Sequence, residues 1–214
     1  LLPSASVLKY LKGVRPQTAG ALLAFGNPDL GDPRLDLKHA QTEALSVSKV
    51  LPNSRALVRR EASESAFKRY GEGFKYLHIA SHGTFYADSP LNSALLLAKD
   101  STNDGTLTVG ELYSMRLNAD LVTLSACETG LGKIANGDDV VGLTRGFLYA
   151  GSRSIVASLW KVDDEATAYL MTKFYSALKG TSKREALRLV QIETRKKYPH
   201  PYYWAAFQLT GEAN

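Results

Sequence analysis

The sequence is poor in the features that mark disulfide-rich and membrane proteins. It has one cysteine, Cys127, among 214 residues, so no disulfide can form within the chain. A lone cysteine fits a reducing compartment. No apolar run approaches the roughly 20 residues that a membrane-spanning helix needs, and we expect neither a membrane segment nor a signal peptide. Because the chain opens at Leu1 without methionine, we expect it to be a piece of a longer protein.

Charge of one sign is also scarce. The formal net charge is +5, and the basic residues gather in residues 57–70 and 182–198, where they alternate with apolar positions at helical spacing. That pattern is typical of the solvated faces of helices, so we expect no nucleic-acid partner. One cysteine and scattered histidines offer no metal-ligand spacing, and we expect neither a metal nor a cofactor.

What the sequence does have is a regular alternation of short apolar runs and amphipathic stretches. Strands are expected at residues 21–28, 55–60, 75–83, 119–130, 153–160 and 202–211. Helices are expected at residues 37–52, 63–73, 137–151, 163–180 and 182–198. A β-hairpin followed by a short helix is expected at residues 93–112, around the turn sequence NDG. The order predicts a three-layer α/β fold with a mainly parallel six-stranded sheet flanked by helices, in one domain over residues 1–214.

Two of the predicted strands end in residues that can react. His82 and Gly83 close the strand with the sequence LHIASHG, and Cys127 closes the strand with the sequence LVTLSACETG. Chemistry in open parallel sheets gathers beyond the carboxyl ends of the strands, and strands joined by a crossover are often neighbours. A thiol beside an imidazole is the minimal apparatus for acyl transfer. The backbone N–H groups of Gly83 and Cys127 can supply an oxyanion hole.

Other interpretations compete with this one. A single cysteine is usually an inert core residue, and a histidine at a strand end often serves only as a hydrogen-bonding cap. His78 has the same strand parity as His82 but lies inside the strand, which favours packing. The run GLGKIA formally matches a dinucleotide-binding loop, yet no acidic residue stands about 20 positions further on, which argues against that site.

The motifs SHG, LSACETG and SLWKVDDEAT, in this order, resemble those of the CHAT family, caspase-like domains commonly found behind tetratricopeptide repeats. The likeness extends from about Ala21 to Gly211. It implies a caspase-hemoglobinase fold and a Cys–His protease dyad, with His82 in SHG and Cys127 in SACETG as its members. It also implies an upstream tetratricopeptide-type repeat region that controls the protease. Asp139 stands where the family often has glycine, which does not touch the dyad.

Acidic residues at the same predicted sheet edge bear on substrate choice. Asp163 and Asp164 follow the fifth strand, and Glu128 follows the cysteine. Both aspartates can cap the next helix, and Glu128 can be a surface carboxylate that caps its loop. The segment LWKVDD is also similar to one in separases, and this likeness implies that Asp164 binds a basic side chain. Because carboxylates pair bidentately with arginine, the prediction is a cysteine endopeptidase that cleaves after Arg, and less well after Lys.

The sequence also bears on an alternative function and on the oligomeric state. A catalytically silent caspase-like module that acts in interaction or signalling is the alternative function. The domain is expected to be a monomer, or a weak dimer through an exposed edge strand at residues 202–211.

Overall fold

The protein is built around one six-stranded sheet. The computed structural model describes residues 20–86, 88–125, 139–160 and 163–214. The strand order is β2-β1-β3-β7-β8-β9, and all neighbours are parallel except β8 and β9. The bounds are β1 (Gly20–Pro28), β2 (Arg55–Arg59), β3 (Phe74–Ala80), β7 (Leu121–Leu124), β8 (Ser154–Ser158) and β9 (Phe207–Gly211). The predicted mainly parallel six-stranded sheet is confirmed.

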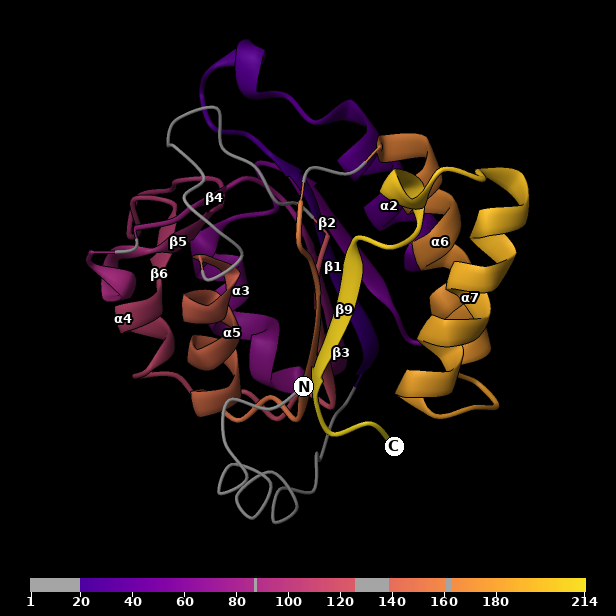
Figure 1. Ribbon diagram of the computed structural model, residues 1–214. Coiled ribbons are helices and arrows are strands. Elements are labelled where there is room, and N and C mark those ends of the chain that lie inside the picture. Colours follow the sequence, from indigo (N-terminus) through magenta and orange to yellow (C-terminus); the bar gives the residue numbers. More distant parts are fainter. Residues whose placement is uncertain (1–19, 87, 126–138, 161–162) are drawn as a thin grey trace.

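Helices cover both faces of this sheet (Figure 1). One face carries α2 (Lys38–Val47), α6 (Asp164–Ala177) and α7 (Lys183–Lys197). The other carries α3 (Glu64–Tyr70), α4 (Val109–Leu112) and α5 (Asp139–Tyr149). The central strands are buried on both sides, which explains why their sequences read as continuous apolar runs rather than as alternating ones. The three predicted layers are therefore present.

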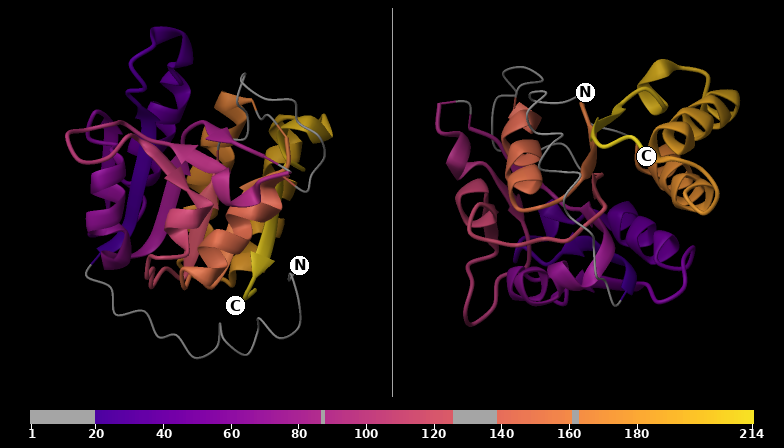
Figure 2. Two further views of the ribbon diagram at one scale, coloured as in Figure 1. Left: turned by 90° about the vertical axis from the view of Figure 1, so that its left-hand side faces the viewer. Right: turned by 90° about the horizontal axis from the view of Figure 1, so that it is seen from below.

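A smaller antiparallel sheet lies on the α3/α5 side. It contains β4 (Gly83–Thr84), β5 (Ala94–Leu96) and β6 (Thr106–Thr108), and the left view of Figure 2 shows it in front of the larger sheet. β5 and β6 form the predicted hairpin, and Gly105 adopts a φ of 90°, which favours glycine. Thr108 then starts α4 with a capping box to Glu111.

Several predicted elements have different bounds in the structure, and two strands show why. The strand expected over residues 75–83 ends at Ala80, and Gly83 belongs to β4 of the smaller sheet instead. The strand expected over residues 202–211 begins only at Phe207, because Pro201 opens a 3-10 turn, η4 (Pro201–Tyr203). β9 nevertheless lies at the edge of the sheet, as expected.

No helix in the described ranges combines the length and the apolar composition that a membrane span requires.

Candidate active site

The two strands that precede the predicted dyad are neighbours. β3 and β7 pair in parallel, with Ile79 beside Leu124, and the Ser125 N–H donates to the Ile79 carbonyl at 2.9 Å. Their carboxyl ends therefore lie at one edge of the sheet. Cys127 and Glu128 lie outside the described residues.

His82 lies just beyond the end of β3 and is half-buried. Its Nε2 is 2.9 Å from the Leu35 carbonyl oxygen, in the 3-10 turn η1 (Pro33–Leu35) between β1 and α2. A carbonyl oxygen only accepts, so Nε2 carries the hydrogen of the neutral ring and Nδ1 is the basic nitrogen. The Leu96 N–H donates to the His82 carbonyl at 2.8 Å, which fixes the backbone as well. Both the ring and the backbone of His82 are thus held in place.

The loop that supplies the Leu35 carbonyl is held by residues of β1 and β2. The buried Asn27 accepts from the Leu37 N–H at 2.7 Å, and Arg59 pairs with Asp36 at 2.5 Å. Asn27 and Arg59 have φ values of 49° and 53°, a region that non-glycine residues seldom occupy. Backbone strain of this kind clusters at functional sites.

The acidic side chains of the same loop serve structure rather than proton transfer. A hydrogen bond from the Gly31 N–H, helped by Arg60, holds the pKa of Asp29 below its usual range. The Arg34 guanidinium does the same to the pKa of Asp32. Both carboxyl groups therefore stay ionised near neutral pH.

Gly83 is tightly packed in the smaller sheet. Its φ lies outside the left-handed region, so the backbone conformation does not itself require glycine. A Cβ at this position would lie 3.3 Å from the Ala94 carbonyl oxygen and 3.3 Å from the Phe85 ring, closer than side chains normally pack. The close approach of β5 therefore leaves little room for a side chain here. The predicted role of Gly83 in an oxyanion hole stays a prediction.

The predicted substrate-binding aspartates lie at the start of α6. Asp163 is the helix cap, and its carboxylate accepts from the Ala166 N–H at 3.0 Å. Asp164 is the first residue of the helix, and its side chain is outside the described part of the chain. The capping interpretation of Asp163 is confirmed, and substrate binding by either residue stays a prediction.

Comparison with known proteins identifies the family. The sequence model of the CHAT domain matches residues 1–212. The chain belongs to the CHAT domain family. This CHAT domain is 36% identical to mouse tetratricopeptide repeat protein 28 over 110 residues, 49% of the chain, and 33% identical to the human protein over 145 residues, 65% of the chain. It spans only 4% and 5% of the length of these relatives.

Solved structures share the fold at low sequence identity. Separase, in the Saccharomyces cerevisiae separase–securin complex, aligns with a TM-score of 0.64 and 14% identity, covering 98% of this chain and 14% of that one. The Arg-specific cysteine proteinase gingipain R aligns with a TM-score of 0.61 and 10% identity, covering 97% of this chain and 51% of that one. Both are caspase-like proteins, so the CHAT domain has a caspase-like fold.

Sequence reasoning missed one group of polar residues in this CHAT domain. Glu43 and Tyr175 are buried and contact His78, which is itself fully buried, as its position within the strand predicted. Glu43 lies on the same helix face as Ala40, Ala44 and Val47. An acidic residue at an otherwise apolar position was the signal that could have found it.

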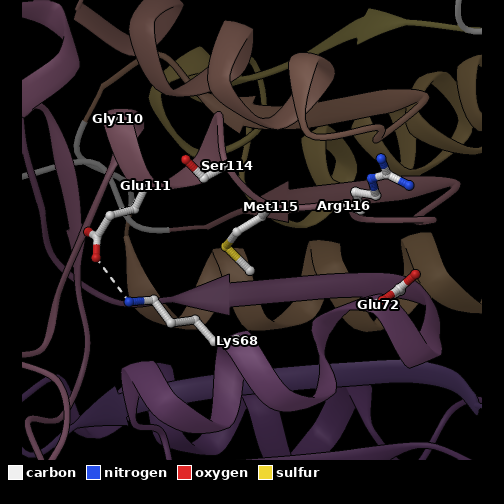
Figure 3. Close-up of a pocket in the computed structure, with 7 residues that line it drawn as sticks. All are labelled: Lys68, Glu72, Gly110, Glu111, Ser114, Met115 and Arg116. Carbon is white, nitrogen blue, oxygen red and sulfur yellow. Dashed lines mark hydrogen bonds and ion pairs between the residues drawn. The ribbon is translucent and has the colours of Figure 1, made fainter.

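A pocket of about 360 Å³ lies elsewhere on the molecule (Figure 3). Its lining includes Met115, Arg116 and Lys68, and Lys68 is paired with Glu111 at 2.9 Å. It opens where α3 leads through the 3-10 turn η2 (Gly71–Gly73) into the start of β3, at the opposite end of that strand from His82. It is therefore separate from the candidate active site. Within the described ranges, no group of three or more histidine, cysteine, aspartate or glutamate side chains is placed to hold a metal ion.

Proposed function

We propose that this CHAT domain is a cysteine endopeptidase with Cys127 as nucleophile and His82 as base. The observation that carries the proposal is the pairing of β3 and β7. His82 and Cys127 follow the carboxyl ends of two adjacent parallel strands, where such sheets hold their active sites. The Leu35 carbonyl supports it further, because it leaves Nδ1 of His82 as the nitrogen that accepts a proton.

The chemistry follows from these roles. Nδ1 of His82 takes the thiol proton of Cys127, and the thiolate attacks the scissile carbonyl. Backbone N–H groups of Gly83 and Cys127 stabilise the oxyanion. The imidazolium then protonates the leaving amine, and an acyl-enzyme forms on the sulfur. Water, deprotonated by the same imidazole, hydrolyses the acyl-enzyme and restores the thiol.

Cleavage after a basic residue is the proposed specificity. Asp163 and Asp164 follow β8 and Glu128 follows Cys127, so all three carboxylates come after strands that end at the same edge of the sheet. Arginine pairs with a carboxylate bidentately and lysine does not, so Arg is preferred over Lys. Gingipain R, which shares the fold, is by its description Arg-specific. Since the Asp163 carboxylate already caps α6, Asp164 is the stronger candidate.

Regulation and context are part of the same proposal. The curated relatives are tetratricopeptide repeat proteins, and we propose that repeats upstream of a single catalytic domain, residues 1–214, control its activity in the cytoplasm. The partners are then protein or peptide substrates and the repeat region, with the catalytic domain itself a monomer or weak dimer.

The dyad is tested with a peptide library, because the physiological substrate is unidentified. We expect Cys127→Ala to abolish hydrolysis and His82→Ala to lower kcat about 10²- to 10⁴-fold, while both variants keep the wild-type melting temperature. The double variant should lose no more than Cys127→Ala alone, since the two groups act together. His39→Ala removes an exposed imidazole on α2 and is the matched control. Near-full activity in His82→Ala contradicts the assignment.

A thiol probe separates the endopeptidase from a silent interaction module. Cys127 is the only cysteine, so alkylation by iodoacetamide reports on it alone. A nucleophile reacts fast at neutral pH in the folded protein, whereas a core cysteine reacts only on unfolding. Slow alkylation together with no hydrolysis of any library peptide favours the silent module.

Specificity is tested with fluorogenic peptides that differ only in the residue before the scissile bond. Asp164→Ala should lose the preference for Arg while Cys127 still reacts with iodoacetamide. Asp163→Ala, which removes the cap, should keep that preference. Wild-type cleavage after apolar or acidic residues contradicts the basic-residue proposal.

A further inference from the structure

Five polar side chains form a buried cluster on the α2/α6 face of the sheet. They come from α2, β3, β7, the residue after β7, and α6. All have exposed fractions of at most 5%: Glu43, His78, Thr123, Ser125 and Tyr175. Burying polar groups costs free energy unless they find partners, and apolar side chains fill the surrounding space. The dyad chemistry uses none of these groups. The burial of these five polar side chains therefore calls for another explanation.

The cluster is connected through one carboxylate oxygen. The Ser125 hydroxyl donates to Oε1 of Glu43 at 2.5 Å, and Nε2 of His78 lies 3.1 Å from the same oxygen. The second contact is close enough for an ion pair but is not aligned as a hydrogen bond. On the other side of the ring, Nδ1 lies 3.3 Å from the Tyr175 hydroxyl, which donates to Thr123 at 2.8 Å. Glu43 therefore contacts both β3 and the end of β7.

Close packing of α2 on the sheet brings Glu43 into this position. A Cβ at Gly26 of β1 would lie 2.5 Å from the Ala44 Cβ and 2.6 Å from the Ala40 carbonyl oxygen. Only a glycine in β1 allows the helix to approach so closely. Since Glu43 precedes Ala44 in the helix, that approach fixes where its carboxylate reaches.

We propose that this cluster is a positioning clamp that fixes the end of β7 against the end of β3. Ser125 is held twice, through its N–H to Ile79 and through its hydroxyl to Glu43. His82 follows β3 closely, and Cys127 follows Ser125 with one residue between them. The clamp thus fixes the two strand ends from which the proposed dyad residues follow. Glu43 and Ser125 are positioning residues, and their effect on catalysis rests on the proposed peptidase function.

Four variants of the full chain test the clamp. Ser125→Ala removes the hydroxyl alone. Glu43→Leu keeps the volume but removes the acceptor, and Glu43→Gln keeps an acceptor oxygen for Ser125 and offers an N–H to His78. Ser154→Ala is the matched control, because Ser154, at the start of β8, is as fully buried and its hydroxyl also donates a hydrogen bond, to the Glu212 carbonyl that follows β9.

Hydrogen exchange measures the clamp without any substrate. We expect Ser125→Ala and Glu43→Leu to speed amide exchange about tenfold or more at residues 78–80 and 123–125, with residues 20–26 unchanged. With a fluorogenic peptide carrying Arg before the scissile bond, kcat should fall about 10- to 100-fold and KM should change less than about twofold. Glu43→Gln should recover most of kcat, and Ser154→Ala should match wild type in both assays.

The outcomes separate the two proposals. Exchange in Ser125→Ala that matches the control overturns the clamp, whatever the activity. Equal losses in Glu43→Gln and Glu43→Leu also overturn it, because charge rather than hydrogen bonding then matters. If Glu43→Leu does not fold, Ser125→Ala decides. If wild type cleaves no peptide but exchange rises only at the two strand ends, the clamp stands and the peptidase proposal fails.

Discussion

The two faces of the central sheet are packed by different means. The α3/α5 face is filled largely by apolar side chains, among them the aromatic series Phe25, Phe67 and Phe147, and its buried Glu64 bonds to the β5–β6 hairpin at Gly105. The α2/α6 face is also largely apolar, but it encloses the ionisable pair Glu43 and His78 beside the strand ends. Apolar contacts have no direction, so many arrangements satisfy them, whereas a hydrogen bond fixes two atoms in one geometry. One face is therefore suited to stability and the other to placement.

The largest expected effect lies on the apolar face. Phe67→Ala removes a fully buried ring that contacts Phe25 at 5.5 Å and Phe147 at 6.2 Å between centroids. It should lower the free energy of unfolding by about 3–5 kcal/mol, as measured by urea denaturation. In conditions where the variant is folded, the rate of Cys127 alkylation should stay at the wild-type value. A large change in that rate would break the division between the faces.

A smaller effect is expected on the polar face. Tyr175→Phe keeps the ring but leaves Thr123 and His78 without the hydroxyl, and should cost about 1–2 kcal/mol of unfolding free energy. Burial raises the pKa of the Tyr175 hydroxyl, so it stays protonated and the cost should not vary between about pH 6 and 9. The hydroxyl of Tyr169 donates to Glu193 near the surface. Tyr169→Phe is therefore the control and should lower the unfolding free energy by less. Equal costs would remove the argument from burial.

The cap of α6 gives the next effect in size. Asp163→Ala removes the acceptor for the Ala166 N–H and should cost about 1 kcal/mol, whereas Asp163→Ser should recover most of it. Chemical denaturation of the three proteins measures this. An unchanged midpoint for Asp163→Ala would show that the cap adds nothing to stability.

The smallest effect belongs to exposed polar groups on the outer surface of α6 and α7. Hydrogen bonds from Lys173, and then from Tyr169, hold the pKa of Glu193 below its usual range. A carboxyl group whose pKa is lowered by folding stabilises the fold at pH values above its pKa in the unfolded chain, near 4.3. This stabilisation is lost as the pH falls through the pKa of the folded protein. The melting temperature of Glu193→Gln should thus fall slightly less than that of wild type when the pH is lowered from 6 to 3. The exposed pair is screened by solvent, so a large difference would contradict this account.

Local patterns in the sequence carried most of the fold. Ser63 predicted the start of α3, which it caps through the Ala66 N–H, and the NDG turn predicted the β5–β6 hairpin. The break after Ala80 was missed, because only a distant partner, β5, draws Gly83 into a second sheet. Strand partners are non-local, and periodicity does not report them.

The site was predictable in part for the same reason. His82 was found because it follows a recognisable apolar run and a motif. Its partner, the Leu35 carbonyl, is a backbone atom 47 residues away and leaves no mark in the sequence. Glu43 was missed because an acidic residue on an amphipathic helix usually faces water, although its spacing from Ala40, Ala44 and Val47 places it on the buried face.

The place of His82 between two sheets has a mechanical consequence. Its chain leaves the six-stranded sheet at Ala80 and enters the three-stranded sheet at Gly83, so the histidine belongs to neither. Its carbonyl is tied to Leu96 of the smaller sheet, while its ring is tied to Leu35 of the larger sheet's loops. A tilt of the small sheet against the large one would therefore change the angle between the His82 backbone and its ring, because the two are bonded to different sheets. The orientation of the His82 ring is therefore coupled to the position of β4, β5 and β6.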